Sequence, residues 1–146
     1  MSDRLKINKA IPAAYQAVVG LEKYMSTATL ISPVQKELIK IRASQINGCA
    51  YCVNQHSRDM RGLGESEQRV YLVSVWRESP QFTAEERIVL ALTEEITLIH
   101  KGGLSDATYN SAVAAFGEEG TAQLIMAAIT INAWNRIGVS TQMKPE

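Results

Sequence analysis

Helix start and stop signals recur from one end of this chain to the other, while strand signals are sparse. Ser32, Pro33 and Gln35 supply an N-cap, a first-turn proline and a capping box, and Thr83 with Glu86 forms a second capping box. These signals predict an all-α protein, a compact helical bundle of about six to seven helices. The expected helices cover residues 11–27, 32–46, 49–62, 66–76, 83–100, 105–116 and 121–137.

One segment fits two structures. Residues 71–76 are rich in β-branched and aromatic side chains, which also favour a strand. A helix is the prediction here, because Ser66 supplies an N-cap at the right place. With 146 residues and no linker longer than a turn, the chain is expected to form one domain over residues 1–146.

The last predicted helix is apolar on nearly every face between Leu124 and Ile131. A helix on the surface could not tolerate this pattern, so it must lie at the centre of the bundle or at a subunit interface. Trp134 and Asn135 follow in the same helix. They are interpreted as core or interface residues and are left out of the predicted site.

Charge and hydropathy argue against two classes of partner. Fifteen basic residues balance fifteen acidic ones, and no stretch gathers the Lys/Arg cluster that binds a phosphate backbone, so we expect no nucleic acid partner. Residues 1–9 lack the apolar segment of a secretory signal, and the apolar run 124–131 is too short to span a bilayer. The sequence therefore predicts a cytoplasmic protein that does not interact with a membrane.

The two cysteines, Cys49 and Cys52, lie three residues apart. A secreted disulfide-stabilised protein of this size would carry several cysteines spread along the chain. Two thiols at this spacing can close a disulfide without moving the backbone, and the positive end of a helix dipole stabilises a thiolate there. The pair therefore predicts redox chemistry or a metal site, with redox chemistry favoured.

His56 lies one helical turn after Cys52, so Cys49, Cys52 and His56 share one face of the predicted helix. The imidazole can accept the proton of Cys52 or stabilise its thiolate. This makes Cys52 the expected nucleophile and Cys49 its resolving thiol.

Glu37 lies on the preceding predicted helix and borders its apolar face. Its carboxylate could reach inward and hold His56 in the tautomer that acts as a base. Its alternative role is a solvated salt bridge with Lys36 or Lys40. Tyr51, between the cysteines, could donate a hydrogen bond to a bound substrate or simply pack beside the site.

Taken together, Glu37, Cys49, Cys52 and His56 resemble the core motif of the alkylhydroperoxidase AhpD-like group within the carboxymuconolactone decarboxylase superfamily. Eleven, two and three residues separate them in turn. Residues 41–49, before and at the first cysteine, are also similar to that family, as are residues 132–136 near the end of the chain. The resemblance covers most of the chain, and the combined motif is specific.

This resemblance implies an AhpD-like all-α fold that assembles into trimers or hexamers. It implies that Cys52 attacks a peroxide, that Cys49 closes the disulfide, and that Glu37 and His56 relay protons to the reactive thiol. A dihydrolipoyl electron donor is a further family expectation. Tyr51 departs from the pattern, because the best-characterised AhpD proteins carry a relay histidine there. Decarboxylases of the superfamily lack the cysteine pair, which favours redox work here.

The prediction is a thiol-dependent oxidoreductase that reduces a peroxide, or acts on another small oxidisable substrate, through a CxxC dithiol/disulfide cycle. An unidentified dithiol would be the electron donor, with no bound cofactor or metal. One alternative is a zinc-binding protein with Cys49, Cys52, His56 and Glu37 as ligands, although structural zinc sites usually draw their ligands from two separated pairs. Another is a non-catalytic oligomer whose cysteine pair senses redox state.

Overall fold

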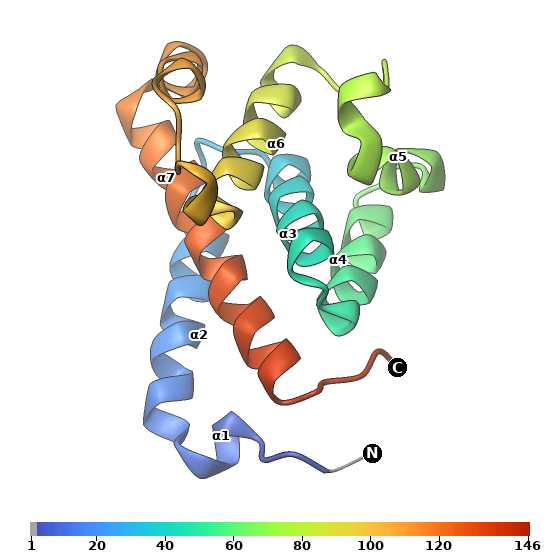
Figure 1. Cartoon of the computed structure of the whole chain (residues 1–146), viewed down its shortest axis with the longest axis vertical. Helices are drawn as coiled ribbons and strands as arrows, with labels where there is room; N and C mark the ends of the chain where they lie inside the picture. The colour runs from blue at the N-terminus through green and yellow to red at the C-terminus, as the bar shows by residue number, and fades with distance from the viewer. Residues whose placement is uncertain (1–2) are drawn as a thin grey trace.

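The computed structural model describes residues 3–146, and the regular elements in that part of the chain are all helical (Figure 1). The predicted all-α fold is therefore confirmed. The elements in chain order are α1 (Ile7–Ala10), α2 (Pro12–Thr27), α3 (Pro33–Asn47), α4 (Ala50–Gly62), α5 (Glu67–Leu72), the 3-10 helix η1 (Val73–Glu78), α6 (Ala84–Thr97), the 3-10 helix η2 (Ile99–Lys101) and α7 (Asp106–Ser140).

The capping boxes at the starts of α3 and α6 are both formed. The Ser32 hydroxyl accepts a hydrogen bond from the Gln35 amide, and the Ser32 amide donates to the Gln35 side chain at 2.8 Å. Thr83 and Glu86 make the same reciprocal pair. Each pair satisfies amides that a helix start would otherwise leave without a partner, so these two boundaries follow from local sequence.

Residues 71–76 are helical, as predicted, but not as a continuation of one regular helix. α5 ends at Leu72 and the chain continues as η1, where the backbone at Val75 leaves helical geometry. The tighter turn lets Val73 and Trp76 reach the core, since both are buried. Burial of these side chains thus decides the local structure here more than strand propensity does.

The C-terminal third contains two helical segments, as predicted, but a single residue and not a loop separates them. α7 runs without an intervening loop, and its backbone leaves helical geometry at Gly117, where φ is +71°. Glycine takes this conformation without the steric cost that a Cβ would bring. The predicted interruption is therefore a kink within α7. The structure also adds the short helix α1, which carries no side-chain cap that the sequence could have revealed.

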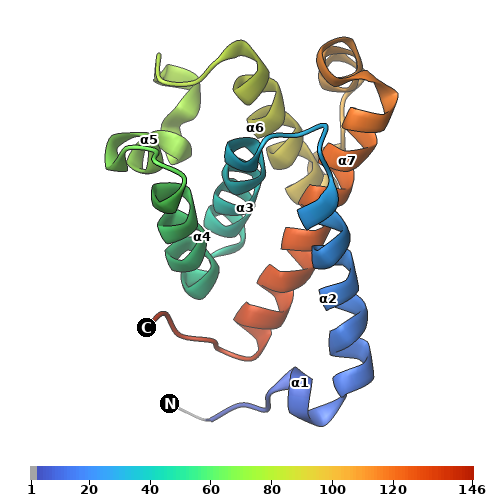
Figure 2. The ribbon, with the colours of Figure 1, turned by 180° about the vertical axis from the view of Figure 1, so that it is seen from behind.

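α3 is the central helix of the bundle. It packs against α4, α6 and α7, and the two ribbon views show it enclosed by these elements (Figures 1 and 2). Ile39 and Ala43 belong to the buried cluster shared with α6 and α7, whereas Leu38 and Ile41 belong to a second cluster with α4, η1 and α6. Because α3 is apolar on two sides, it positions every element of the site described below.

The apolar part of α7 lies in the core, as its composition required. Leu124, Ala128 and Ile131 are fully or almost fully buried, whereas Ile129 remains 42% exposed. α2 packs along α7, and the two ends of the chain approach each other near the end of α7 (Figure 2). Arg4 ties them by donating a hydrogen bond to the Ser140 carbonyl at 2.9 Å. Within residues 3–146, no helix is long and apolar enough to cross a membrane.

Candidate functional site

The cysteine pair lies at the start of α4, immediately after a sharp turn from α3. Gly48 ends α3 in the left-handed region, with φ at +69°, a conformation that glycine adopts at little cost. Cys49 is the N-cap of α4, and its sulfur accepts a hydrogen bond from the Cys52 amide at 3.3 Å. The two cysteines form a disulfide whose Cα atoms lie 5.3 Å apart. The structure thus represents the oxidised state of the pair.

The two cysteines have different surroundings. Both cysteines are buried, but Cys49 borders a hollow of about 170 Å³ that Gly48, Gly138 and Met143 also line. A wider hollow on the other side of the α3–α4 turn also reaches Cys49. Cys52 lines neither of these two hollows. The exposed fractions are similarly small, 2% for Cys49 and 5% for Cys52, so the two sulfurs differ in the hollows they border and not in exposure.

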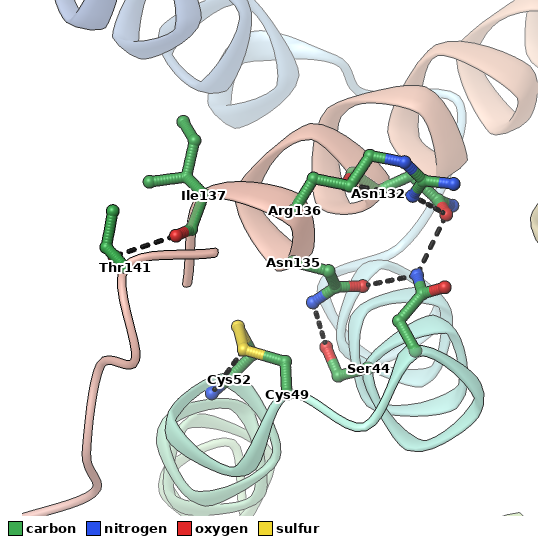
Figure 3. Close-up of a disulfide and its surroundings, with 9 residues drawn as sticks. Ser44, Cys49, Cys52, Asn132, Asn135, Arg136, Ile137 and Thr141 are labelled. Atoms are coloured by element: carbon green, nitrogen blue, oxygen red, sulfur yellow. Dashed lines mark hydrogen bonds between the residues drawn. A yellow bond between two sulfur atoms is a disulfide. The ribbon is translucent and has the colours of Figure 1, made fainter. Parts of the chain in front are cut away.

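The C-terminal part of α7 closes over the disulfide. A Cβ atom placed on Gly138 would lie 3.0 Å from the Cys49 sulfur and 3.6 Å from the Cys52 sulfur, so only glycine fits without displacing them. Figure 3 shows this end of α7 facing the sulfurs. The sequence-based prediction ended the helix at Ile137 and missed Gly138. A lone glycine in an apolar helix was the available signal of a close approach.

A buried polar network fixes α7 beside the cysteines (Figure 3). Asn135 has no exposed surface. Its side-chain amide donates to the Ser44 hydroxyl at 2.8 Å, and its side-chain oxygen accepts from the side-chain amide of Asn47 at 3.0 Å. The same Asn47 amide donates to Asn132 at 2.9 Å. Since Asn47 lies two residues before Cys49, the network sets where the turn into α4 lies. Asn135 is a buried residue, as predicted, but one that also supports the site.

His56 and Glu37 are in direct contact. Nδ1 of His56 lies 3.0 Å from a Glu37 carboxylate oxygen and 3.5 Å from a carboxylate oxygen of Asp59. A nitrogen facing two carboxylates carries the proton, so in the neutral ring Nε2 is left as the acceptor. His56 follows Cys52 by one turn of the same helix, which puts both on one face of α4.

Glu37 is buried, with 8% of its surface exposed, and both of its carboxylate oxygens have partners. One contacts His56, and the other lies 3.2 Å from the Lys40 ammonium. Burial raises the pKa of Glu37, but the hydrogen bond to His56 and the charge of Lys40 outweigh it, so the pKa lies below its ordinary value. Of the two lysines considered from the sequence, Lys40 makes the contact, while Lys36 donates to the Ala28 carbonyl.

Tyr51 lines a hollow of about 470 Å³ between the two ends of the chain. Tyr15 and Ile137 line it as well, and Met143 borders both this hollow and the smaller one at Cys49. Tyr51 thus lines a hollow that shares Met143 with the hollow at Cys49, and both of its predicted roles remain compatible with this position.

The four-ligand zinc set is not assembled in this oxidised state. Within residues 3–146, the group of potential metal ligands whose atoms lie within 4.8 Å of one another joins Glu37, His56 and Asp59. The cysteines are outside it, and sulfurs bonded to each other are not available as thiolates. The cluster is better described as one imidazole nitrogen shared by two carboxylates.

Comparison with known proteins identifies a family and similar proteins. Residues 12–95 match the family described as the carboxymuconolactone decarboxylase family, a span that includes all four motif residues. The uncharacterized protein YdfG of Bacillus subtilis (strain 168) is 37% identical over 140 residues, which cover 96% of this chain and 95% of that one.

Two solved structures are also similar. One, from Agrobacterium tumefaciens, is described as a protein of unknown function and a putative antioxidant defence protein AhpD. It is 39% identical, with a TM-score of 0.94 and 99% of each chain covered. An uncharacterized peroxidase-related protein with an AhpD core from Ralstonia eutropha JMP134 has a TM-score of 0.83 and covers 95% of this chain and 74% of its own. Because it is only 17% identical, it shows a shared fold alone.

The contact of α7 with the sulfurs yields a first testable prediction. Gly138→Ala should lower the free energy of unfolding of the oxidised protein, because the new methyl group would lie 3.0 Å from the Cys49 sulfur. Gly20→Ala is the matched control, since nothing lies within 4 Å of its Cβ and helix propensity should raise stability by about 1 kcal/mol. Urea unfolding measures both. An equal gain in the two variants would contradict the described contact.

A second prediction concerns pH. A carboxyl with a lowered pKa stabilises the fold above its unfolded value, and this contribution is lost as the pH falls through the folded value. Glu37→Gln should therefore cost about 1–2 kcal/mol at neutral pH. The difference from the wild type should shrink as the pH falls through the lowered pKa of Glu37, where the carboxylate takes up a proton.

Urea unfolding at several pH values tests this. The exposed Glu118→Gln is the control and should change the free energy of unfolding by less than about 0.5 kcal/mol throughout. A Glu37→Gln cost that stays constant from neutral to acidic pH would show that the charge of Glu37 contributes nothing.

Proposed function

The chain belongs to the carboxymuconolactone decarboxylase family, as its motif predicted, and we propose that it is a thiol-dependent oxidoreductase that reduces peroxides in the AhpD-like manner. The observation that carries the proposal is a CxxC disulfide at a helix start, with an imidazole one turn later whose Nδ1 is held by a buried carboxylate. This arrangement combines a reversible two-electron couple with a base of fixed tautomer.

In the reduced enzyme Cys52 is the nucleophile. His56 accepts the thiol proton at Nε2, because Glu37 occupies Nδ1. The thiolate attacks the terminal oxygen of a hydroperoxide and the O–O bond breaks. Cys52 becomes a sulfenic acid, and the alkoxide takes the proton from His56 and leaves as an alcohol. The helix N-terminus of α4 favours the thiolate before the attack.

Cys49 completes the oxidation. Its thiol attacks the sulfenic sulfur of Cys52, the S–S bond forms and water leaves. A dithiol donor then returns the pair to two thiols by two exchange steps and becomes a disulfide itself. The hollow at Cys49 supports this order, because it offers the donor a path to that sulfur.

The hollow between the chain ends is the proposed place for the organic part of the hydroperoxide. Tyr51 and Tyr15 line it, and its border residue Met143 is shared with the hollow at Cys49. The phenol of Tyr51 is then positioned to hydrogen-bond the peroxide, in place of the relay histidine of the best-characterised relatives. The histidine of those relatives takes part in the proton relay, so without it we expect a slower peroxidase.

Assembly and location follow the same proposal. We expect a homo-oligomer, a trimer or hexamer, that acts in the cytoplasm. Large apolar side chains left exposed on the single chain support an oligomer, among them Leu5, Ile11, Tyr24 and Ile99.

The decisive experiment follows hydroperoxide consumption by the reduced protein. The wild type should consume one equivalent of cumene hydroperoxide and lose two titratable thiols, and it should turn over when dihydrolipoamide is supplied. Cys52→Ser should slow consumption by at least about 100-fold, since it removes the nucleophile. Cys49→Ser is the matched control, because it should consume one equivalent and then stop without closing a disulfide.

Undiminished consumption by Cys52→Ser would rule out the mechanism. Oxidation of both thiols in the wild type without turnover with any dithiol donor would favour the redox-sensing alternative instead. Stoichiometric zinc bound to unreactive thiols would favour the metal-binding alternative.

A further inference from the structure

Glu37 is one member of a longer chain of charged contacts that crosses the bundle. Lys40, one turn further along α3, lies 3.2 Å from a Glu37 oxygen and 3.2 Å from a Glu22 oxygen. Glu22 belongs to α2, and its other oxygen accepts a hydrogen bond from the Trp134 indole of α7 at 3.2 Å. Four helices therefore contribute to one network that ends at His56.

Each oxygen of Glu37 has a different partner. The oxygen near Lys40 is not the one that faces His56. Lys40 therefore fixes the rotation of the carboxylate as well as its charge, because turning the group would break one of the two contacts. The Lys40 side chain is itself only 18% exposed, so solvent does little to weaken these contacts.

Lys40 is held from two sides, by the buried Glu37 and more weakly by Glu22, whose side chain is 38% exposed. Burial lowers the pKa of Lys40, but the charges of Glu37 and Glu22 outweigh this and raise it above its ordinary value. Two further charged groups face the same region: Lys36 and Asp59 line a hollow with Glu37. Asp59 contacts His56 at 3.5 Å, but its side chain is 45% exposed, so it is a weaker partner than Glu37.

We propose that Lys40 is a positioning residue for the reaction of Cys52: anchored by Glu22, it keeps the Glu37 carboxylate ionised and turned toward His56. This inference rests on the proposed function, because it assigns a role in activating the same thiol. Lys40 touches neither the sulfurs nor the substrate hollow and acts only through Glu37 and His56. Without it, Glu37 would take up a proton at a higher pH and would be free to rotate away from Nδ1.

The test measures how fast the single thiol of the Cys49→Ser protein reacts with iodoacetamide and with cumene hydroperoxide between pH 4 and pH 9. Lys40→Gln should slow both reactions by about 10-fold at neutral pH, within the range measured for coupled charged neighbours. The rate should fall on the acidic side of the pH profile, and this fall is called the acidic limb. Lys40→Gln should move the acidic limb to higher pH, because Glu37 loses a cation that keeps it ionised. Lys40→Arg, which keeps the charge, should restore most of the rate.

Two matched variants separate positioning from a general effect on the fold. Lys36→Gln removes a neighbouring lysine of α3 that donates to a backbone carbonyl, and it should leave the profile within about 2-fold of the parent. Glu22→Gln releases Lys40 from its anchor and should move the acidic limb in the same direction by a smaller step. A merely structural role for Lys40 would lower stability without moving the limb.

A double-mutant cycle gives the sharpest criterion. In a Glu37→Gln background, adding Lys40→Gln should change the rate by less than about 2-fold, because Lys40 acts only through Glu37. A full additional loss there, or an acidic limb unmoved in both Lys40→Gln and Glu22→Gln, would overturn the inference.

The two proposals can fail separately. If the wild type consumes no hydroperoxide, the peroxidase proposal fails, while the iodoacetamide profile still decides the role of Lys40, since alkylation requires only the thiolate. If peroxide is consumed but the limb does not move, the Lys40 inference fails alone.

Discussion

In the proposed mechanism, the hydrogen bond between His56 and Glu37 is the contact on which the chemistry depends. It joins α4, which carries the cysteines, to the central helix α3. A buried carboxylate would be costly alone, and here an imidazole and the Lys40 ammonium share its charge. Because Nδ1 contacts the carboxylate, the edge of the imidazole that carries Nε2 points away from it. In the proposed reaction, the cysteine pair thereby gains a base whose tautomer is set by the fold.

The rest of the bundle serves to hold that arrangement and to limit access to it. α7 is docked on α3 by the Asn135 network and reaches the sulfurs at Gly138, where no side chain intervenes. The disulfide is therefore covered on one side by helix backbone and opened on another by the hollow at Cys49. The geometry gives the two cysteines different surroundings, which suits a cycle in which one sulfur meets the oxidant and the other meets the donor.

What the sequence could predict was set by local rules. Capping boxes located the starts of α3 and α6, and the spacing of three and four residues put Cys49, Cys52 and His56 on one helix face. The contact of Glu37 with His56 was only a possibility, because the crossing of α3 and α4 depends on packing. The close approach of Gly138 and the role of Asn135 were missed for the same reason. The kink at Gly117 replaced a predicted loop, since one glycine in the left-handed region changes the helix direction without extra residues.

The most direct test of the central claim is to locate the sulfur that reacts first. Each single-cysteine protein, Cys49→Ser and Cys52→Ser, is reduced, mixed with one equivalent of hydroperoxide and trapped with dimedone, and the adduct is mapped by peptide mass spectrometry. The account predicts rapid sulfenic acid formation on Cys52, a large loss of that adduct when His56→Ala is added, and little reaction of Cys49. Faster trapping on Cys49, or an adduct on Cys52 that does not depend on His56, would contradict it.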